Sequence, residues 1–162
     1  MTSNLFLTYY AQGSIITLSM KRGQKMDISV KLESGTRAKE NFYIGLYIDK
    51  ENNYILKGGT TNELARRFAE HRRNNPKLKH YPAQEEFAFI PIFHIKLSRA
   101  NTLKLEDDFM NQIKKLECYK YILNDRFLLK DDLPEFIYLT VKKTYVISFR
   151  QIVQEELRKM GR

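Results

Sequence analysis

A run of seven almost entirely apolar residues, 42–48 (FYIGLYI), constrains the fold of this chain more than any other feature. Such a run is typical of a strand that is buried on both faces. A polar turn at 49–53 separates it from a second β-forming run at 54–57, and this short loop predicts an antiparallel hairpin. Two glycines follow, and then Thr60 and Glu63 give the S/T-x-x-E pattern that opens a helix. The middle of the chain is therefore expected to be a hairpin followed by a helix.

The segment before the hairpin is rich in β-forming residues. Three runs, at 5–10, 14–19 and 26–32, combine β-branched, aromatic and aliphatic residues and are separated by turn formers. This pattern predicts two or three short strands. We therefore expect residues 1–40 to form an N-terminal β-rich extension.

The part after the first helix continues with a strand and a second helix. Residues 87–97 are predicted to form the strand, in which Pro91 indicates an edge position or a bulge. Asn101 or Thr102 is expected to cap the helix. The apolar residues of that helix recur at helical spacing and predict one buried face: Leu105, Phe109, Ile113 and Leu116.

The order of these elements predicts an α+β fold. A strand region at 136–147 and a helix at 148–160 complete the chain, so we expect a small antiparallel sheet with helices packed on it. A single core is the norm for a chain of 162 residues. The expected organisation is a core domain at 41–118 and a C-terminal β/α tail at 119–162 that packs on this core.

The charge balance restricts the kinds of partner. Lys and Arg number 28 against 19 Asp and Glu, a net charge of +9. Nucleic acid is the first partner to consider, although an anionic membrane or ribosomal surface fits the charge equally well. The single cysteine, Cys118, excludes an internal disulfide. With neither a signal peptide nor the roughly 18 apolar residues that a membrane span needs, we expect a soluble, intracellular protein of the cytoplasm or nucleus.

Much of the positive charge gathers just after the hairpin. Between residues 61 and 80 only two acidic residues, Glu63 and Glu70, oppose six cations: Arg66, Arg67, Arg72, Arg73, Lys77 and Lys79. A run of this kind is usually a solvated helix face. Because it directly follows a strand and a glycine pair, we also predict that the cations other than Arg67 form a DNA-binding surface.

Two glycine-containing tripeptides lie on the predicted hairpin. Gly45-Leu46-Tyr47 is on the first strand, and Lys57-Gly58-Gly59 is at the end of the second. In order and spacing they resemble the two tripeptides that name the GIY-YIG nucleases. Leu stands in place of Ile in the first, and the second keeps only its final glycine. Lys57 in place of the usual Tyr also occurs in branches of that family.

The residues that follow strengthen the resemblance. The stretch from Gly59 to Arg67 matches the family's glycine, small polar residues, capped helix start and essential arginine, and His71 lies one helical turn beyond Arg67. The likeness is specific over 43–71 and extends as a pattern over 87–116. It implies a metal-dependent endonuclease that hydrolyses DNA and leaves a 5′-phosphate and a 3′-hydroxyl.

The resemblance also implies a carboxylate on a later helix that binds Mg²⁺ or Mn²⁺. Glu106 is the best candidate, because it stands beside the apolar stripe of the second helix and is expected to point along the edge of the sheet. Asp107 and Asp108 could substitute but turn toward solvent, and Glu135 is a remoter alternative. Hard cations of this kind prefer such oxygen ligands.

The remaining site residues have roles suited to phosphodiester hydrolysis. Arg67 would reach two phosphate oxygens with its planar fork. Tyr47 would act as the general base or orient the attacking water. Since its ordinary pKa is about 10, it needs a nearby cation, which Lys57 could supply. His71 would share the base role or bind the phosphate.

Each of these residues also has a purely structural explanation. Tyr47 in an apolar strand would be a packing residue, and Arg67 a solvated helix residue. His71 suits the end of a helix and Glu106 the start of one, because of the helix dipole. What favours the nuclease is that these residues occur together in the family's order.

The sequence is therefore consistent with three functions. The first is the DNA-cutting enzyme. The second is a catalytically inactive nucleic-acid-binding module on the same fold, which the degenerate second tripeptide favours. The third is a basic protein-interaction domain. The DNA could be duplex, branched or single-stranded, RNA is an alternative, and a homodimer would suit the cleavage of both strands.

Overall fold

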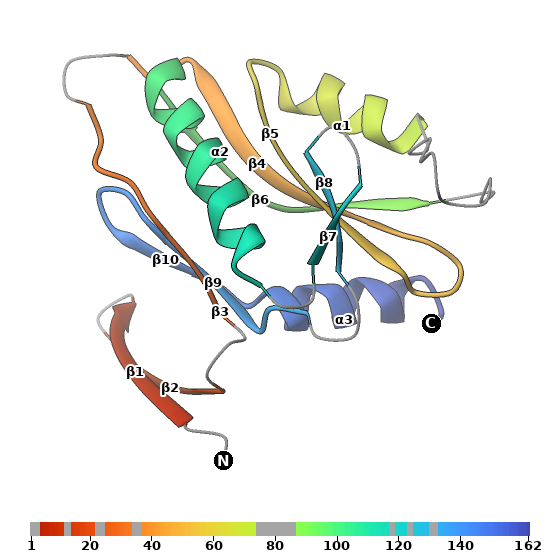
Figure 1. The fold of residues 1–162 in the computed structure, drawn as a ribbon, viewed down its shortest axis with the longest axis horizontal. Coiled ribbons are helices and arrows are strands. Elements are labelled where there is room, and N and C mark those ends of the chain that lie inside the picture. The colour runs from red at the N-terminus through yellow and green to blue at the C-terminus, as the bar shows by residue number, and fades with distance from the viewer. Residues whose placement is uncertain are drawn as a thin grey trace.

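The computed structural model describes most of the chain. It covers residues 4–11, 14–21, 25–33, 37–73, 87–116, 119–122, 125–129 and 133–162, with side chains from Lys25 onward. Helices and strands are mixed in this part of the chain (Figure 1), which confirms the predicted α+β class.

A five-stranded antiparallel sheet forms the centre of the fold. Its strands, in spatial order, are β6 (Ala88–Leu97), β4 (Glu40–Ile48), β5 (Tyr54–Thr61), β8 (Arg126–Leu129) and β7 (Tyr119–Tyr121). The predicted hairpin is correct as the β4–β5 pair. The predicted end of its second strand is wrong, because β5 continues through Gly58 and Gly59 and stays paired with β4.

A second, smaller sheet joins segments that are far apart in the sequence. β3 (Lys25–Ser29) pairs in parallel with β9 (Phe136–Thr140), and β9 pairs antiparallel with β10 (Thr144–Ile147). β1 (Asn4–Ala11) and β2 (Ser14–Lys21) form an antiparallel pair of their own. The strands predicted within residues 1–40 are therefore present, and β3 shares a sheet with the C-terminal segment.

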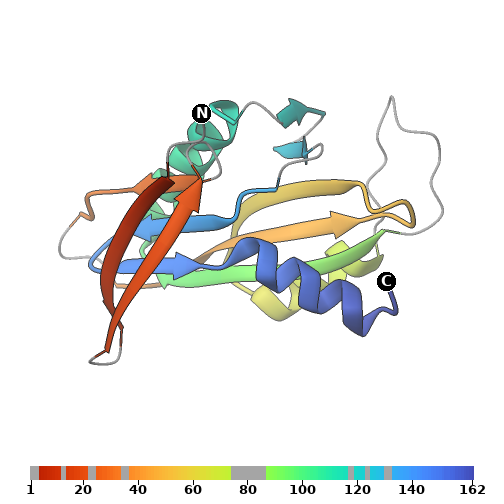
Figure 2. The ribbon, with the colours of Figure 1, turned by 90° about the horizontal axis from the view of Figure 1, so that it is seen from below.

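The main core lies between the five-stranded sheet, β3 and α2 (Arg99–Lys114) (Figure 2). The predicted apolar face of α2 is confirmed, since its residues are buried: Leu105, Phe109, Ile113 and Leu116. The predicted cap is wrong. Ser98, and not Asn101 or Thr102, is the N-cap, and its hydroxyl accepts a hydrogen bond from the Asn101 N–H at 3.3 Å. Glu106 therefore stands in the middle of the helix.

A smaller core lies on the opposite side of the sheet under α1 (Leu64–Arg73) (Figure 2). Its buried residues are Tyr47, Ile55, Phe87 and Phe89, with Phe68 of α1 packed against them. The predicted capping box of Thr60 and Glu63 is wrong, because β5 continues through Thr61 and the helix begins only at Leu64. In the turn between them, the Thr61 hydroxyl accepts a hydrogen bond from the Glu63 N–H at 3.1 Å.

The two edges of the sheet differ in how far the sequence predicts them. β6 is an edge strand whose register shifts opposite Ile44 and Gly45, next to Pro91, so both expectations for this proline are confirmed. β7 and β8 were not predicted, and they extend the sheet beyond β5.

The predicted final helix is confirmed as α3 (Phe149–Lys159).

Candidate active site

Two tyrosines of β4 point toward α1. Tyr43 and Tyr47 lie on the same face of the strand, because side chains alternate along it. They are 1% and 0% exposed. The motif in the sequence points to Tyr47 and not to Tyr43, although the spacing of four residues within one strand was a signal for both.

His71 of α1 lies between these two tyrosines. The Tyr43 hydroxyl is 2.8 Å from His71 Nε2, and the Tyr47 hydroxyl is hydrogen-bonded to His71 Nδ1. The Phe89 ring stacks on the imidazole with 4.6 Å between centroids. Arg67 Nε donates a hydrogen bond to the Tyr43 hydroxyl at 3.3 Å. Arg67, Tyr43, His71 and Tyr47 thus form a hydrogen-bonded series, here called the Arg–Tyr–His–Tyr chain.

Burial sets the protonation states along the Arg–Tyr–His–Tyr chain. It lowers the pKa of His71 to about 4, and the positive charges around the ring add to the effect. The imidazole is therefore neutral at pH 7, with one N–H and one bare nitrogen. Because each nitrogen faces a tyrosine, one tyrosine donates to the ring and the other accepts from it. Burial raises the pKa of Tyr43 and raises that of Tyr47 to about 12, so both stay protonated near neutrality.

Glycines make this close packing possible. A Cβ at Gly59 would lie 2.6 Å from the Tyr43 hydroxyl oxygen, and a Cβ at Gly58, on the other face of β5, would lie 2.4 Å from the Phe109 ring. Both separations are shorter than real Cβ contacts. The middle residue of the second tripeptide, which the resemblance expects to be apolar, is glycine here because Phe109 of α2 fills that space.

Lys57 and Arg126 stand side by side on the face of the sheet that carries α1. They are direct partners across β5 and β8, and such partners share a face. Lys57 is 8% exposed, and burial lowers its pKa. The Arg126 guanidinium lies 5.6 Å from the centroid of the Tyr47 ring. The cation over Tyr47 is therefore Arg126, whereas Lys57 lies opposite Gly45.

Glu106 reaches the same region from the other side of the sheet. Within the described chain β8 accompanies β5 only from Tyr54 to Lys57, so no described strand lies beside the outer edge of β5 beyond Lys57. Glu106 lies near this edge, since it is hydrogen-bonded to Thr60 and its charge acts on the pKa of Lys57. Burial raises the pKa of Glu106, and the Lys57 charge opposes that rise.

The other carboxylates considered for a metal point elsewhere. Asp107 is exposed, and Asp108 accepts a hydrogen bond from the Ser29 N–H at 3.0 Å. Glu135 directly precedes β9 of the smaller sheet. The described residues contain no group of three or more His, Cys, Asp or Glu side chains that could hold a metal ion. Glu106 fits a Mg²⁺ ion held by one carboxylate, water and substrate oxygens, which is a common arrangement for this metal.

The predicted DNA-binding cations lie around the end of α1. Arg72 and Arg73 are exposed in its last turn. Lys77 and Lys79 fall outside the described residues. Arg66 is half-exposed, and its guanidinium is already held by carboxylates of its own helix and the residue before it. It is therefore less available to a phosphate than Arg72 or Arg73.

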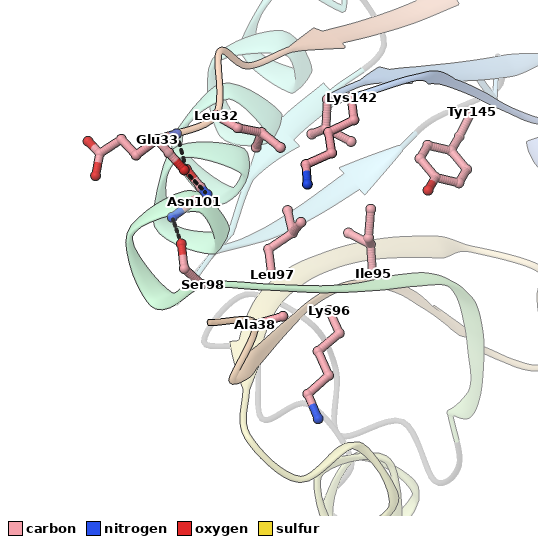
Figure 3. A pocket seen from close by; sticks show the side chains of 11 residues that line it. Leu32, Glu33, Ala38, Ile95, Lys96, Leu97, Ser98, Asn101, Lys142 and Tyr145 are labelled. Carbon is pink, nitrogen blue, oxygen red and sulfur yellow. Dashed lines mark hydrogen bonds between the residues drawn. The ribbon is translucent and has the colours of Figure 1, made fainter. Parts of the chain in front are cut away.

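A hollow of about 600 Å³ lies in another part of the molecule (Figure 3). Leu97 at the end of β6 lines it, together with Lys142 and Tyr145 from the β9–β10 hairpin. None of the residues of the Arg–Tyr–His–Tyr chain lines this hollow, and neither do Lys57, Glu106 or Arg126. The hollow is therefore separate from the candidate site.

Comparisons with known proteins do not assign a family. No protein-family model, curated protein or solved structure matches the chain. Among the described helices, none is long and apolar enough to cross a membrane. A function must therefore be inferred from the geometry and chemistry of the site.

Proposed function

We propose that the chain is a metal-dependent endonuclease that hydrolyses DNA phosphodiester bonds in the manner of the GIY-YIG nucleases. The observation that carries the proposal is the meeting of five residues from four elements: Tyr47, Lys57, Arg67, His71 and Glu106. Hydrolysis of a phosphodiester needs an acceptor for the proton of water, cations for the phosphate oxygens and a ligand for a metal. These five residues offer all three.

The contacts of Arg67 support a role in binding phosphate. Its Nε donates to Tyr43 and one terminal nitrogen donates to Glu70 at 3.0 Å, so the guanidinium is held in one orientation. The side chain is nevertheless 39% exposed, which leaves part of its fork open to a ligand. A guanidinium held in this way can donate to two phosphate oxygens.

Tyr47 and His71 together can take up the proton of the attacking water. In one of the two imidazole tautomers, Tyr47 donates to a bare Nδ1. Tyr47 can then accept a proton from water while it passes its own to His71. This transfer avoids a free phenolate, which a tyrosine with a pKa of about 12 would not form near neutral pH. It produces an imidazolium at His71, whose pKa is about 4, so the step requires the negative charge of the bound phosphate to favour the protonated ring.

Glu106 is the residue that would hold the metal. A Mg²⁺ or Mn²⁺ ion there would neutralise charge on the phosphate and stabilise the leaving oxygen. Lys57 helps to keep the Glu106 carboxylate ionised, because its charge lowers a pKa that burial raises. An ionised carboxylate is the form that binds a cation.

Plasmid nicking tests this proposal. The wild type is expected to nick supercoiled DNA with Mg²⁺ or Mn²⁺ and not with EDTA. Glu106→Ala and Arg67→Ala are expected to lose about 100-fold or more of the nicking rate, since each removes a charge that acts in the transition state. Asp107→Ala is the matched control, because it removes an exposed carboxylate next to Glu106, and it should nick like the wild type.

A DNA-binding module without catalysis is the second candidate. Two observations favour it: the high pKa of Tyr47, and the absence from the described residues of a group of three or more side chains that could hold a metal ion. DNA binding by the wild type with no metal-dependent nicking would contradict the enzyme and support this module. Failure to bind DNA even at low salt would contradict both and favour a protein-interaction domain.

A further inference from the structure

Arg126 lies at the end of the Arg–Tyr–His–Tyr chain that is opposite to Arg67. Arg67 contacts Tyr43, whereas the Arg126 guanidinium lies over the Tyr47 ring. Arg126 is the first residue of β8, at the point where β8 stops and the outer edge of β5 opens. A guanidinium group is therefore present at each end of the proposed catalytic residues.

This placement of Arg126 is unfavourable in the free protein. Lys57, another cation, stands directly opposite it, and like charges in that position destabilise a sheet. The Asp125 carboxylate offsets part of this repulsion, because its charge raises the pKa of Lys57 while that of Arg126 lowers it. Arg126 Nε is buried and has no hydrogen-bond partner among the described residues, and a buried donor of this kind costs free energy. No described carboxylate forms an ion pair with this guanidinium.

An anion would compensate for these unfavourable features. It would screen Arg126 from Lys57 and would give the guanidinium a partner. A phosphate suits the position best, because a guanidinium matches a phosphate in geometry as well as in charge. A nucleic-acid strand bound at the proposed cleavage site would supply such phosphates, because they follow one another along its backbone.

We propose that Arg126 is a substrate-binding residue that holds a backbone phosphate of the nucleic acid next to the phosphate bound by Arg67. The proposal rests on the proposed function and adds to it a contact from the β7–β8 hairpin, outside the core predicted at 41–118. The Arg126 charge also acts on the residues proposed to move the proton. It opposes the rise that burial causes in the pKa of Tyr47, and it adds to the lowering of the pKa of His71.

Binding of a fluorescein-labelled DNA oligonucleotide in EDTA tests this proposal without cleavage. Arg126→Met keeps an apolar stem over Tyr47 and removes the charge. It is expected to weaken binding by about 10-fold and to reduce the slope of log affinity against log salt by about 1. Arg126→Lys keeps the charge without the fork and should bind with intermediate affinity. Arg158→Ala, which removes the same charge from an exposed position on α3, should bind within about twofold of the wild type.

Urea unfolding separates a binding role from a structural one. Because Arg126→Met removes the repulsion with Lys57, it should unfold at the same urea concentration as the wild type or at a higher one. Weaker binding at undiminished stability supports the proposal. Wild-type affinity and salt slope in Arg126→Met overturn it, as does weaker binding accompanied by lower stability, or a wild type that does not bind. A failure of the nuclease proposal would be seen separately, as binding without nicking in Mg²⁺.

Discussion

Replacing Gly59 with alanine perturbs the packing that holds the proposed proton acceptor. The new Cβ would lie 2.6 Å from the Tyr43 hydroxyl oxygen and 2.7 Å from the ring carbon that bears it. Tyr43 is enclosed and hydrogen-bonded to His71, so it can move only by disturbing that bond. Overpacking of this kind costs about 1–3 kcal/mol. Alanine also restricts the unfolded chain more than glycine does, which stabilises the folded state by about 0.4–1 kcal/mol. We therefore expect a net loss of roughly 1–2 kcal/mol in the free energy of unfolding.

Gly58→Ala is the matched control for this substitution. Its Cβ would lie 2.4 Å from the Phe109 ring, on the face of β5 that looks toward α2. A similar loss of stability is expected, with the Tyr43–His71 contact left in place. Urea unfolding at pH 7 measures both losses, and plasmid nicking is compared at a temperature at which both variants are folded. Gly59→Ala should lose about 10-fold or more of the nicking rate, and Gly58→Ala much less.

Two results would refute this reasoning. Wild-type stability in Gly59→Ala would show that Tyr43 moves away at no cost. An equal loss of nicking in both variants would show that general stability, and not the position of Tyr43, limits the activity.

Other predictions concern charge. The free energy of unfolding should rise from pH 4 to pH 6.5, because over this range the unfolded chain binds a proton at His71 that the folded chain, with a pKa of about 4, does not. The contribution of His71 to the free energy of unfolding is therefore complete above pH 6.5 and is lost as the pH falls toward 4. Urea unfolding across this range should show the rise, and an unchanged rise in His71→Gln would contradict it. In DNA-binding titrations, Arg72→Ala and Arg73→Ala should each reduce the salt slope by about 1. Arg66→Ala should reduce it less, because Glu63 and Glu70 already hold Arg66. Equal reductions in all three variants would contradict this difference.

The elements that bury a continuous face could be predicted from the sequence. The apolar run of β4 and the helical spacing in α2 and α3 are local patterns that burial imposes directly. β7 and β8 are too short for a period to be visible, and they exist because they pair with β5. The cap of α2 was missed for a related reason. Ser98, Asn101 and Thr102 can all cap a helix, and only the place where β6 ends decides among them.

The candidate site also contains some residues that a local sequence pattern predicts and others that it does not. Arg67 and His71 could be predicted because they follow one another on a single helix turn, and Tyr43 could have been found from its alternation with Tyr47. Arg126 has no local signal, since its place beside Lys57 arises from the register between β5 and β8. Glu106 was a candidate in the sequence, but its hydrogen bond to Thr60 depends on how α2 crosses the sheet.

The parallel pairing of β3 with β9 has a consequence for how the molecule folds. It joins Lys25 to Phe136, residues about 110 positions apart, and it places Met26 and Ile28 in the main core. During synthesis these two side chains have no partner in this sheet until the chain has been made as far as β9. Closing so long a loop is slow, and it leaves apolar surface exposed in the meantime. All residues of the candidate site, from Tyr43 to Arg126, belong to the long loop that this pairing closes.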